Sequence, residues 1–369
     1  MTSLAQSPRI RRSPYYDATV AAGVTDFTVY NKMLLPLSYG DLQAEYRCLT
    51  QTVALWDVAC QRQVEVSGPE ASQLVQYLSS RDLTAMAVGQ GRYVALCGYD
   101  GSILNDPVLL KLAEDRYWFS IADADITLWA RAIAVERGFN ASVFEPDVSP
   151  LAIQGPYADA VGADLFGEQA RDLPFFGCVQ TELEGIPLVL MRSGWSRQGG
   201  FELYLQDGAC GSDLWELVYE AGVPYGIGPG APNHVERVES GLFSYGGDNT
   251  PGSNPFEVGM APFVDVDTPV DYIGKTPLQK VVGEGPARLF VGVFIDADMA
   301  DDWPLPQRTP ITRHDRLVGT LSAVVFSPRL ERTIGLAQIE RGVVEAGAPV
   351  EVTAPDRIHK ATITSLPFV

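Results

Sequence analysis

The sequence predicts an α+β fold, because strand patterns and helix patterns interleave without the long apolar βαβ runs of a parallel sheet. Residues 62–67 alternate apolar and polar side chains, turn at Gly68-Pro69, and lead into residues 71–78 with apolar side chains at helical spacing. Residues 116–137 repeat this order of strand and helix. The last quarter of the chain instead contains short alternating strands separated by Pro and Gly, which predicts a small β-barrel or sandwich.

The helix expected in residues 123–137 has recognisable ends. Asp123 or Asp125 can cap its N-terminus, and Gly138 can end it. Its apolar residues recur at helical spacing on one face, as in an amphipathic helix.

The next elements are two strands and the glycine-rich segment that joins them, in residues 186–191, 201–205 and 193–200. Alternation along the second strand would place Glu202 and Tyr204 together, on the face opposite its apolar residues. A short helix is expected over residues 213–220, ending at Gly222.

The composition of the 369 residues favours a folded protein, with 46% hydrophobic and 20% charged residues. At roughly 150 residues per domain, the length implies about two to three domains. The segment 284–287, which contains Gly285-Pro286, is the expected linker.

Lys and Arg number 27 against 46 Asp and Glu, and the resulting net charge of −19 repels phosphate backbones and anionic lipids. We therefore exclude nucleic acid and membrane surfaces as partners.

Cysteine and histidine usage narrows the chemistry further. The five cysteines are widely spaced without a C-x-x-C pair, and the three histidines are isolated. This favours free thiols in a reducing cytoplasm and argues against a disulfide framework or a metal site. No apolar stretch approaches the ~18 residues of a membrane helix, so a cytoplasmic protein is expected.

Two short motifs resemble sites of common enzymes but have the wrong residues. In residues 194–199, Gln198 stands where a serine-hydrolase G-x-S-x-G turn needs glycine. In residues 226–230, Pro229 and the nearby Pro232 would spoil a dinucleotide-binding turn, and no hydrophobic parallel strand precedes it. We expect a rigid loop before a helix there.

Two other polar segments are candidates for a binding site. In residues 99–110 a tight turn delivers Asn105 and Asp106 just before an apolar strand, where they could read an amide-like ring edge or simply cap the turn. In residues 192–204 a loop with Trp195 leads into the strand that carries Glu202. A carboxylate beside an aromatic loop suits a pterin, which offers paired N–H donors and a flat ring.

The segment 193–204 resembles the T-G-Y-T-G-E-x-G-F-E block of the aminomethyltransferase family, to which the T-protein of the glycine cleavage system belongs. Further blocks of that family follow in the same order over nearly the whole chain, including residues 33–36, 56–58, 151–156, 237–241 and 254–259.

Within this family the chain is similar to the dimethylsulfoniopropionate demethylases. Residues 101–106 place Asn105 where the T-protein pattern G-G-x-x-D-D has its first, catalytic Asp. The demethylase motifs are matched at Asn105-Asp106-Pro107, at residues 30–36 and at residues 193–200. The chain departs from them at Lys32, where His is expected, and at Arg92, where the first Tyr of a pair is expected.

The resemblance implies a three-domain cloverleaf of the aminomethyltransferase type that encloses tetrahydrofolate. Residues 1–283 would form two α+β domains interleaved in sequence, and residues 284–369 the C-terminal small β-barrel. By resemblance, catalytic roles fall to Asn105 and Trp195, where Asn105 either orients folate or caps its turn. The residues expected at the folate are Tyr93, Trp195, Glu202, Arg237 and Tyr245, and those expected at the methyl donor are Tyr30, Lys32 and Arg92. For Arg237 the alternative is a salt bridge to Glu239 or Glu236.

The implied reaction moves a methyl group from dimethylsulfoniopropionate to tetrahydrofolate, giving methylthiopropionate and 5-methyltetrahydrofolate. The alternatives are a related sulfonium or betaine donor, a glycine-cleavage aminomethyltransferase, which Asn105 disfavours, and a non-catalytic folate-binding protein of the same fold. The expected partners are the methyl donor and folate, and a homodimer is the candidate assembly.

Overall fold

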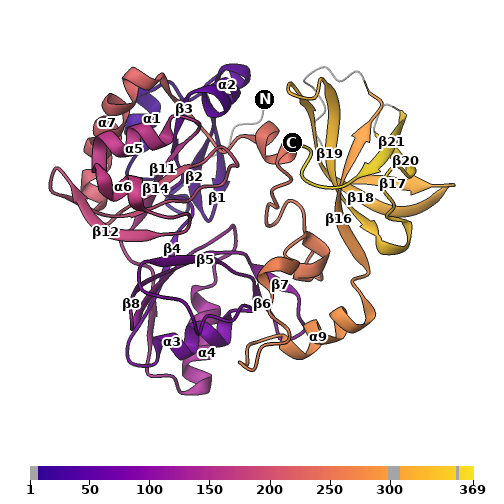
Figure 1. Ribbon diagram of the computed structural model, residues 1–369, viewed down its shortest axis with the longest axis horizontal. Coiled ribbons are helices and arrows are strands. Elements are labelled where there is room, and N and C mark those ends of the chain that lie inside the picture. The colour runs from indigo at the N-terminus through magenta and orange to yellow at the C-terminus, as the bar shows by residue number, and fades with distance from the viewer. Residues whose placement is uncertain (1–6, 298–307, 355–356) are drawn as a thin grey trace. The chain divides into compact units, whose positions relative to one another are not determined.

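The computed structural model describes residues 7–297, 308–354 and 357–369 (Figure 1). The chain forms two compact units. The first comprises the described residues up to Tyr77, Leu83–Val94 and Asn105–Asn233. The second comprises Leu78–Asp82, Ala95–Leu104 and the described residues from His234 onward.

A six-stranded sheet forms the centre of the first unit, in the order β12 (Cys178–Leu183), β13 (Ile186–Met191), β14 (Gly200–Leu205), β11 (Ser149–Gln154), β3 (Val53–Asp57) and β15 (Ile227–Gly230). The β13–β14 pair and the loop between them are as expected from the sequence. The expectation of a loop at 226–230 is wrong, because these residues form β15, which pairs parallel to β3 with Ile227 opposite Val53. All other described pairs in this sheet are antiparallel.

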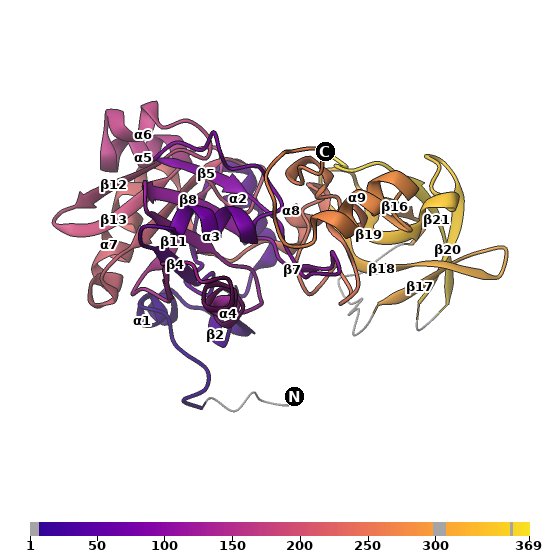
Figure 2. The same cartoon turned by 90° about the horizontal axis from the view of Figure 1, so that it is seen from below.

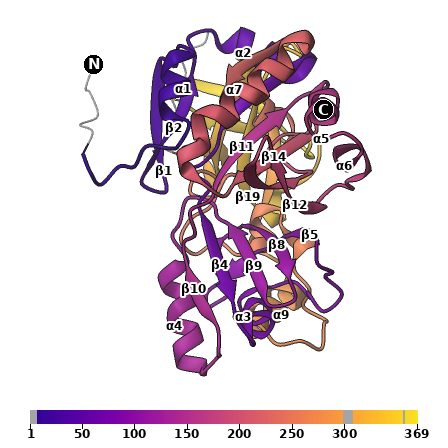
Figure 3. The same ribbon diagram turned by 90° about the vertical axis from the view of Figure 1, so that its left-hand side faces the viewer.

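Helices and a hairpin accompany this sheet: α1 (Tyr16–Ala21), β1 (Asp26–Tyr30), β2 (Met33–Ser38), α2 (Leu42–Gln51), α5 (Ala158–Phe166), α6 (Glu168–Asp172) and α7 (Gly211–Gly222). Short 3₁₀ turns, η1 (Gly208–Cys210) and η2 (Val223–Tyr225), flank α7. Figure 3 shows α5 and α7 beside β11 and β14. Their apolar faces and the sheet share one core that includes Phe201, Leu203 and Leu214, all fully buried.

A second sheet of the first unit has five antiparallel strands, in the order β10 (Ser142–Phe144), β4 (Gln63–Ser67), β9 (Arg116–Ser120), β8 (Val108–Ala113) and β5 (Gln90–Tyr93). The expected strand–turn–helix is present as β4 followed by α3 (Ala71–Leu78). The helix expected over 123–137 begins later, as α4 (Thr127–Arg137), and ends at Gly138 in the left-handed conformation. Asp125 accepts a hydrogen bond from the Thr127 N–H at 2.8 Å, which holds the segment before the helix in a turn.

The C-terminal part of the second unit is a closed six-stranded barrel, in the order β16 (Arg288–Ile295), β19 (Arg332–Glu340), β18 (Arg316–Ser327), β17 (Thr309–Arg313), β20 (Pro349–Thr353) and β21 (Ile358–Thr364). Alternate residues fill its interior, among them Val293, Leu321 and Ile363. The predicted α+β fold with a C-terminal β-barrel is confirmed.

The remaining elements of the second unit are short: β6 (Leu96–Cys97), most of β7 (Ile103–Asn105), α8 (His234–Glu239), η3 (Pro255–Val258), η4 (Ala261–Phe263), α9 (Lys275–Glu284) and η5 (Arg341–Val343). Figure 2 shows α8 beside the barrel strands, where Val238 packs with Ile334 and Leu336. The division of the chain at residue 284 stays a prediction. In the described part of the chain, none of the helices has the length and apolar character needed to cross a lipid bilayer.

Candidate functional site

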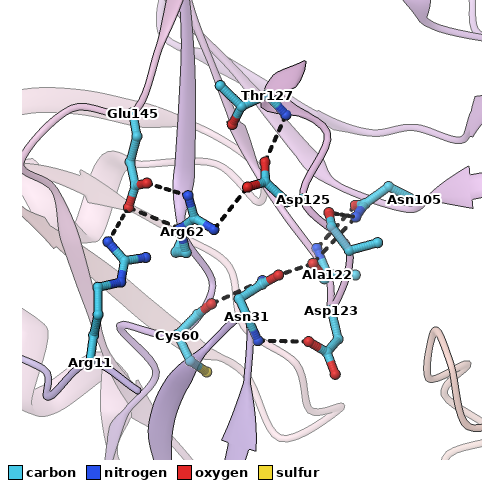
Figure 4. A network of polar contacts seen from close by, with 11 residues as sticks. Arg11, Asn31, Cys60, Arg62, Asn105, Ala122, Asp123, Asp125, Thr127 and Glu145 are labelled. Carbon is cyan, nitrogen blue, oxygen red and sulfur yellow. Dashed lines mark hydrogen bonds and ion pairs between the residues drawn. The ribbon is translucent and has the colours of Figure 1, made fainter. Parts of the chain in front are cut away.

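A tight hairpin places Tyr30, Asn31 and Lys32. Asn31 and Lys32 form its two-residue turn with φ angles of 49° and 60°, the backbone conformation typical of a type I′ turn. The buried Asn31 side chain donates to the carbonyls of Cys60 (3.1 Å) and Ala122 (2.8 Å), and its backbone N–H donates to Asp123 (2.6 Å) (Figure 4). These bonds fix the hairpin against the segment that follows β9 and leave Lys32 exposed at the tip.

Asn105 is bound to the same segment. Its amide donates to the carbonyls of Ala124 (2.8 Å) and Ala122 (3.3 Å) and accepts from the Ala122 N–H (3.0 Å) (Figure 4). The side chain is fully buried. These bonds go to residues 122–124 and not to the turn that contains Asn105. An ionised carboxylate at this position could not donate to the two carbonyls, so these bonds need an amide.

An ion-pair network supports this segment from its other side. Arg62 pairs with Asp125 at 3.3 Å and also with Glu145, which in turn pairs with Arg11 at 2.7 Å (Figure 4). Because Asp125 also caps the turn before α4, the network holds the segment between β9 and α4 in one conformation.

Tyr93 and Asp106 form a second contact near Tyr30. The Tyr93 hydroxyl donates to Asp106 Oδ2 at 2.6 Å. Burial, followed by the nearby Asp106 carboxylate, raises the pKa of both Tyr93 and Tyr30 well above the usual value, and Tyr30 also acts on Tyr93. Two neutral phenols therefore adjoin one carboxylate.

Arg92 precedes Tyr93 in β5, and successive side chains of a strand point to opposite faces. Its guanidinium donates to the Gly91 carbonyl (3.2 Å) and to Gln90 Oε1 (3.3 Å) on its own strand. The structure thus brings Tyr30 and Tyr93 together and places Arg92 on the other face of the strand.

Glu202 lies on β14 and is 5% exposed. Ser193 and Tyr204 both donate to its Oε2, the latter at 3.0 Å, which confirms that Glu202 and Tyr204 share a face. Burial raises the pKa of Glu202, while these two hydrogen bonds oppose the rise. Among the residues that the structure describes, Oε1 accepts no hydrogen bond, yet it is not enclosed. A ligand with an N–H donor would fit this oxygen.

The loop that carries Trp195 is fastened to the buried Gln154. Gln154 Nε2 donates to the Ser193 carbonyl at 3.0 Å, and Ser196 donates to Gln154 Oε1 at 2.7 Å. Gly194 has a φ of 154°, and a Cβ there would lie 2.0 Å from Gln154 Nε2. Glycine is therefore required at this approach, and the half-buried Trp195 follows it.

Arg237 and Tyr245 belong to the second unit. The predicted alternative partners of Arg237 are wrong: its guanidinium pairs with the fully buried Asp248 at 2.7 Å and donates to the Leu242 carbonyl at 2.9 Å. Asp248 also accepts from the Ser244 N–H (2.8 Å) and from Ser322 on β18 (2.6 Å).

These bonds fix the backbone on both sides of Tyr245, which lies between Ser244 and Asp248. The two glutamates that the sequence suggested have other partners: Glu239 accepts from Arg329 and Glu236 from Ser240.

Sequence reasoning did not find the residues that fix the candidate side chains, which are Asn31, Gln154 and Ser193 in the first unit and Asp248 in the second. Asn31 carried a partial signal, because Asn is favoured at the positive-φ positions of a two-residue hairpin turn, whereas Lys32 is not. In the described residues no group of three or more His, Cys, Asp or Glu side chains could hold a metal ion.

Comparison with known proteins gives the family. Residues 15–268 match the GCVT N-terminal domain, and residues 288–369 match the glycine cleavage T-protein C-terminal barrel domain. The chain is 41% identical to the dimethylsulfoniopropionate demethylase DmdA of Ruegeria pomeroyi over 98% of both chains. It is 30% identical to an aminomethyltransferase of Symbiobacterium thermophilum over 97% of both chains.

Among solved structures, the glycine cleavage system aminomethyltransferase T of Bartonella henselae has the same fold, with a TM-score of 0.86 and 24% identity over 98% of both chains. The matches cover both the α+β region and the barrel. The chain therefore belongs to the glycine cleavage T-protein family of aminomethyltransferases.

Proposed function

We propose that the protein is a tetrahydrofolate-dependent demethylase of dimethylsulfoniopropionate. The observation that carries the proposal is the 41% identity to a dimethylsulfoniopropionate demethylase along 98% of both chains, against 30% to an aminomethyltransferase. Asn105 agrees with it, because a fully bonded neutral amide takes the place of the catalytic carboxylate of aminomethyl transfer.

The proposed transfer breaks one S–C bond, whose electron pair stays on sulfur, and forms one N–C bond at N5 of tetrahydrofolate, whose proton leaves to solvent. The products are methylthiopropionate and 5-methyltetrahydrofolate. No covalent intermediate with the enzyme is needed, so the work of the protein is to hold donor and acceptor in line, which can contribute up to ~7–11 kcal/mol.

Glu202 is the proposed anchor of the pterin ring. Its Oε1 accepts no described hydrogen bond, and its Oε2 is held by Ser193 and Tyr204, so the carboxylate is fixed and has one oxygen available. Trp195, Tyr93 and Tyr245 are proposed aromatic neighbours of the folate. Arg237 is proposed to act by fixing the loop of Tyr245, because Asp248 neutralises its charge.

The methyl donor is proposed to bind at the turn between β1 and β2. Tyr30, Tyr93 and Trp195 offer ring faces to the sulfonium, each worth about 0.5–2 kcal/mol as a cation–π contact. Lys32 is the proposed partner of the donor carboxylate, because it is exposed at the hairpin tip and has no ion-pair partner among the described residues. Arg92 is the weaker candidate, since it lies on the opposite face of β5 from Tyr93.

We further propose a cytoplasmic protein, with folate and the methyl donor as its small-molecule partners. A homodimer remains the candidate assembly. A boundary at residue 284 would separate the folate-binding region, residues 1–283, from the barrel.

The test is the formation of 5-methyltetrahydrofolate with dimethylsulfoniopropionate, other sulfonium compounds, glycine betaine and methylamines as donors. We expect product with dimethylsulfoniopropionate, together with methylthiopropionate in equal amount. Turnover with betaine alone would assign a different donor, and ammonia release from an aminomethyl-lipoyl carrier would indicate an aminomethyltransferase. Folate binding without product from any donor would leave a non-catalytic folate-binding protein.

A further inference from the structure

One carbonyl oxygen brings two distant parts of the first unit together. The Ala122 carbonyl accepts from Asn31 at 2.8 Å and from Asn105 at 3.3 Å (Figure 4). Tyr30 directly precedes Asn31, and Asp106 directly follows Asn105. The shared acceptor therefore brings together the backbone segments that carry Tyr30 and Asp106, which are 76 positions apart in the sequence.

Asp106 is held in a defined orientation. The end of β5 pairs with the start of β8, with Tyr93 opposite Val108, and the Val94 N–H donates to the Pro107 carbonyl at 3.1 Å. This pairing brings the Tyr93 hydroxyl to 2.6 Å from Asp106 Oδ2. The carboxylate is thus held by the Tyr93 hydroxyl, and Tyr30 lies near it, since burial and then the Asp106 charge raise the pKa of Tyr30.

We infer that Asp106 is the counter-ion that selects a methylated onium cation, which binds against this carboxylate and the rings of Tyr30 and Tyr93. The inference rests on the proposed function and goes beyond it by naming the residue that recognises the positive charge of the donor.

The cluster suits a sulfonium, because it combines one negative charge with aromatic ring faces. A primary ammonium brings three N–H donors that need acceptors, whereas a sulfonium brings charge and methyl groups but no donor. The Tyr93 hydroxyl already directs its own donor to Asp106. A carboxylate together with ring faces matches a cation that needs charge compensation without hydrogen bonds.

Loss of the sulfonium charge during methyl transfer determines how removal of Asp106 should affect KM and kcat. The sulfonium carries a full positive charge in the bound donor and loses it as the methyl group leaves. Asp106 therefore stabilises the bound donor at least as much as the transition state, so its removal should raise KM more than it lowers kcat. A purely structural role would lower the affinity for charged and uncharged ligands alike.

The experiment compares the wild-type protein with Asp106→Asn, using dimethylsulfoniopropionate as substrate and methylthiopropionate as the uncharged-sulfur probe. We expect KM for dimethylsulfoniopropionate to rise about 10- to 100-fold in Asp106→Asn, with kcat within about three-fold and the Kd of methylthiopropionate within about two-fold. Tyr93→Phe keeps the ring and removes the hydroxyl, so its KM should rise less than that of Asp106→Asn.

Asp164→Asn is the matched control, because Asp164 accepts from the Tyr225 hydroxyl at 2.7 Å but lies elsewhere, on α5. Its kinetic constants should equal those of the wild type. An unchanged KM in Asp106→Asn, or equal losses for both ligands, would overturn the inference. If Asp106→Asn does not fold, the wild type decides alone: equal affinity for the sulfonium and the thioether would refute the role of Asp106. An inactive wild type would instead refute the proposed function.

Discussion

Replacing Glu202 with Gln tests the proposed pterin anchor while changing only one atom of the side chain. Glu202 is 5% exposed, and Ser193 and Tyr204 donate to its Oε2. In Glu202→Gln the amide oxygen should take the place of Oε2, because both neighbours are donors there. The amide nitrogen then occupies the place of Oε1 and presents a donor where the pterin also presents donors.

The magnitudes for folding and for binding differ. A hydrogen bond to a charged group contributes about 1.5–3 kcal/mol, so losing the bond to the pterin should weaken tetrahydrofolate binding roughly 10- to 150-fold. In folded Glu202→Gln both Ser193 and Tyr204 keep an acceptor. The variant also no longer buries a negative charge, whose burial is unfavourable, as the raised pKa of Glu202 in the wild type indicates. The free energy of unfolding should therefore stay equal or rise at neutral pH.

Calorimetric titration with tetrahydrofolate and urea unfolding measure the two effects separately. Glu182→Gln on β12 is the control, because Glu182 is exposed on the same sheet. A Glu202→Gln variant that binds tetrahydrofolate within two-fold of the wild type would refute the anchor. In the wild type, tetrahydrofolate binding should weaken as the pH falls through the raised pKa of Glu202, because protonation removes the acceptor charge.

Three further variants test the supporting structure. Burial raises the pKa of Asp57 from 3.8 to about 6, so the folded state binds this proton more tightly, and the stabilisation is lost as the pH rises through that window. Asp57→Asn has no such proton to lose, so its unfolding free energy relative to the wild type should grow by about 2 kcal/mol between pH 4 and pH 7 in urea titrations. Asn105→Asp removes two donors that face the Ala122 and Ala124 carbonyls and should cost about 2–4 kcal/mol, and a urea midpoint equal to that of the wild type would contradict this. Gly194→Ala would place a Cβ 2.0 Å from Gln154 Nε2, so it should displace the loop of Trp195, lower the melting temperature and lower kcat roughly 10- to 100-fold, which steady-state rates and calorimetry together can check.

The sequence predicts those elements whose signal is local. Parts of the barrel strands alternate in sequence, as at residues 289–295 and 350–352, and β13 and β14 flank the glycine-rich loop. β15 is missed because four residues, Ile227–Gly230, with a proline and two glycines have no strand pattern of their own. Their conformation comes from parallel pairing with β3, which is 174 positions away at Val53 and Ile227.

The candidate site shows the same division. Family motifs indicate the residues that would contact ligands, such as Glu202 and Trp195. The side chains that fix them are set by tertiary contacts: Asn105 bonds residues 17 and 19 positions away, and Gln154 bonds a serine 42 positions away. No spacing rule links such pairs, so their roles follow only from the folded structure.

Arg237 has a different role in the structure from the one that its motif suggests. By its position in the motif, Arg237 is expected to supply positive charge near the folate. In the structure Arg237 is 5% exposed and its guanidinium pairs with Asp248, so the pair as a whole is neutral. A buried pair of this kind is more effective at fixing a conformation than at attracting an anion, because its field is largely cancelled within the pair. Under the proposed function, an exposed cation such as Lys32 would then be the partner of an anionic ligand. The motif arginine would serve that ligand indirectly, by holding the loop of Tyr245 in place.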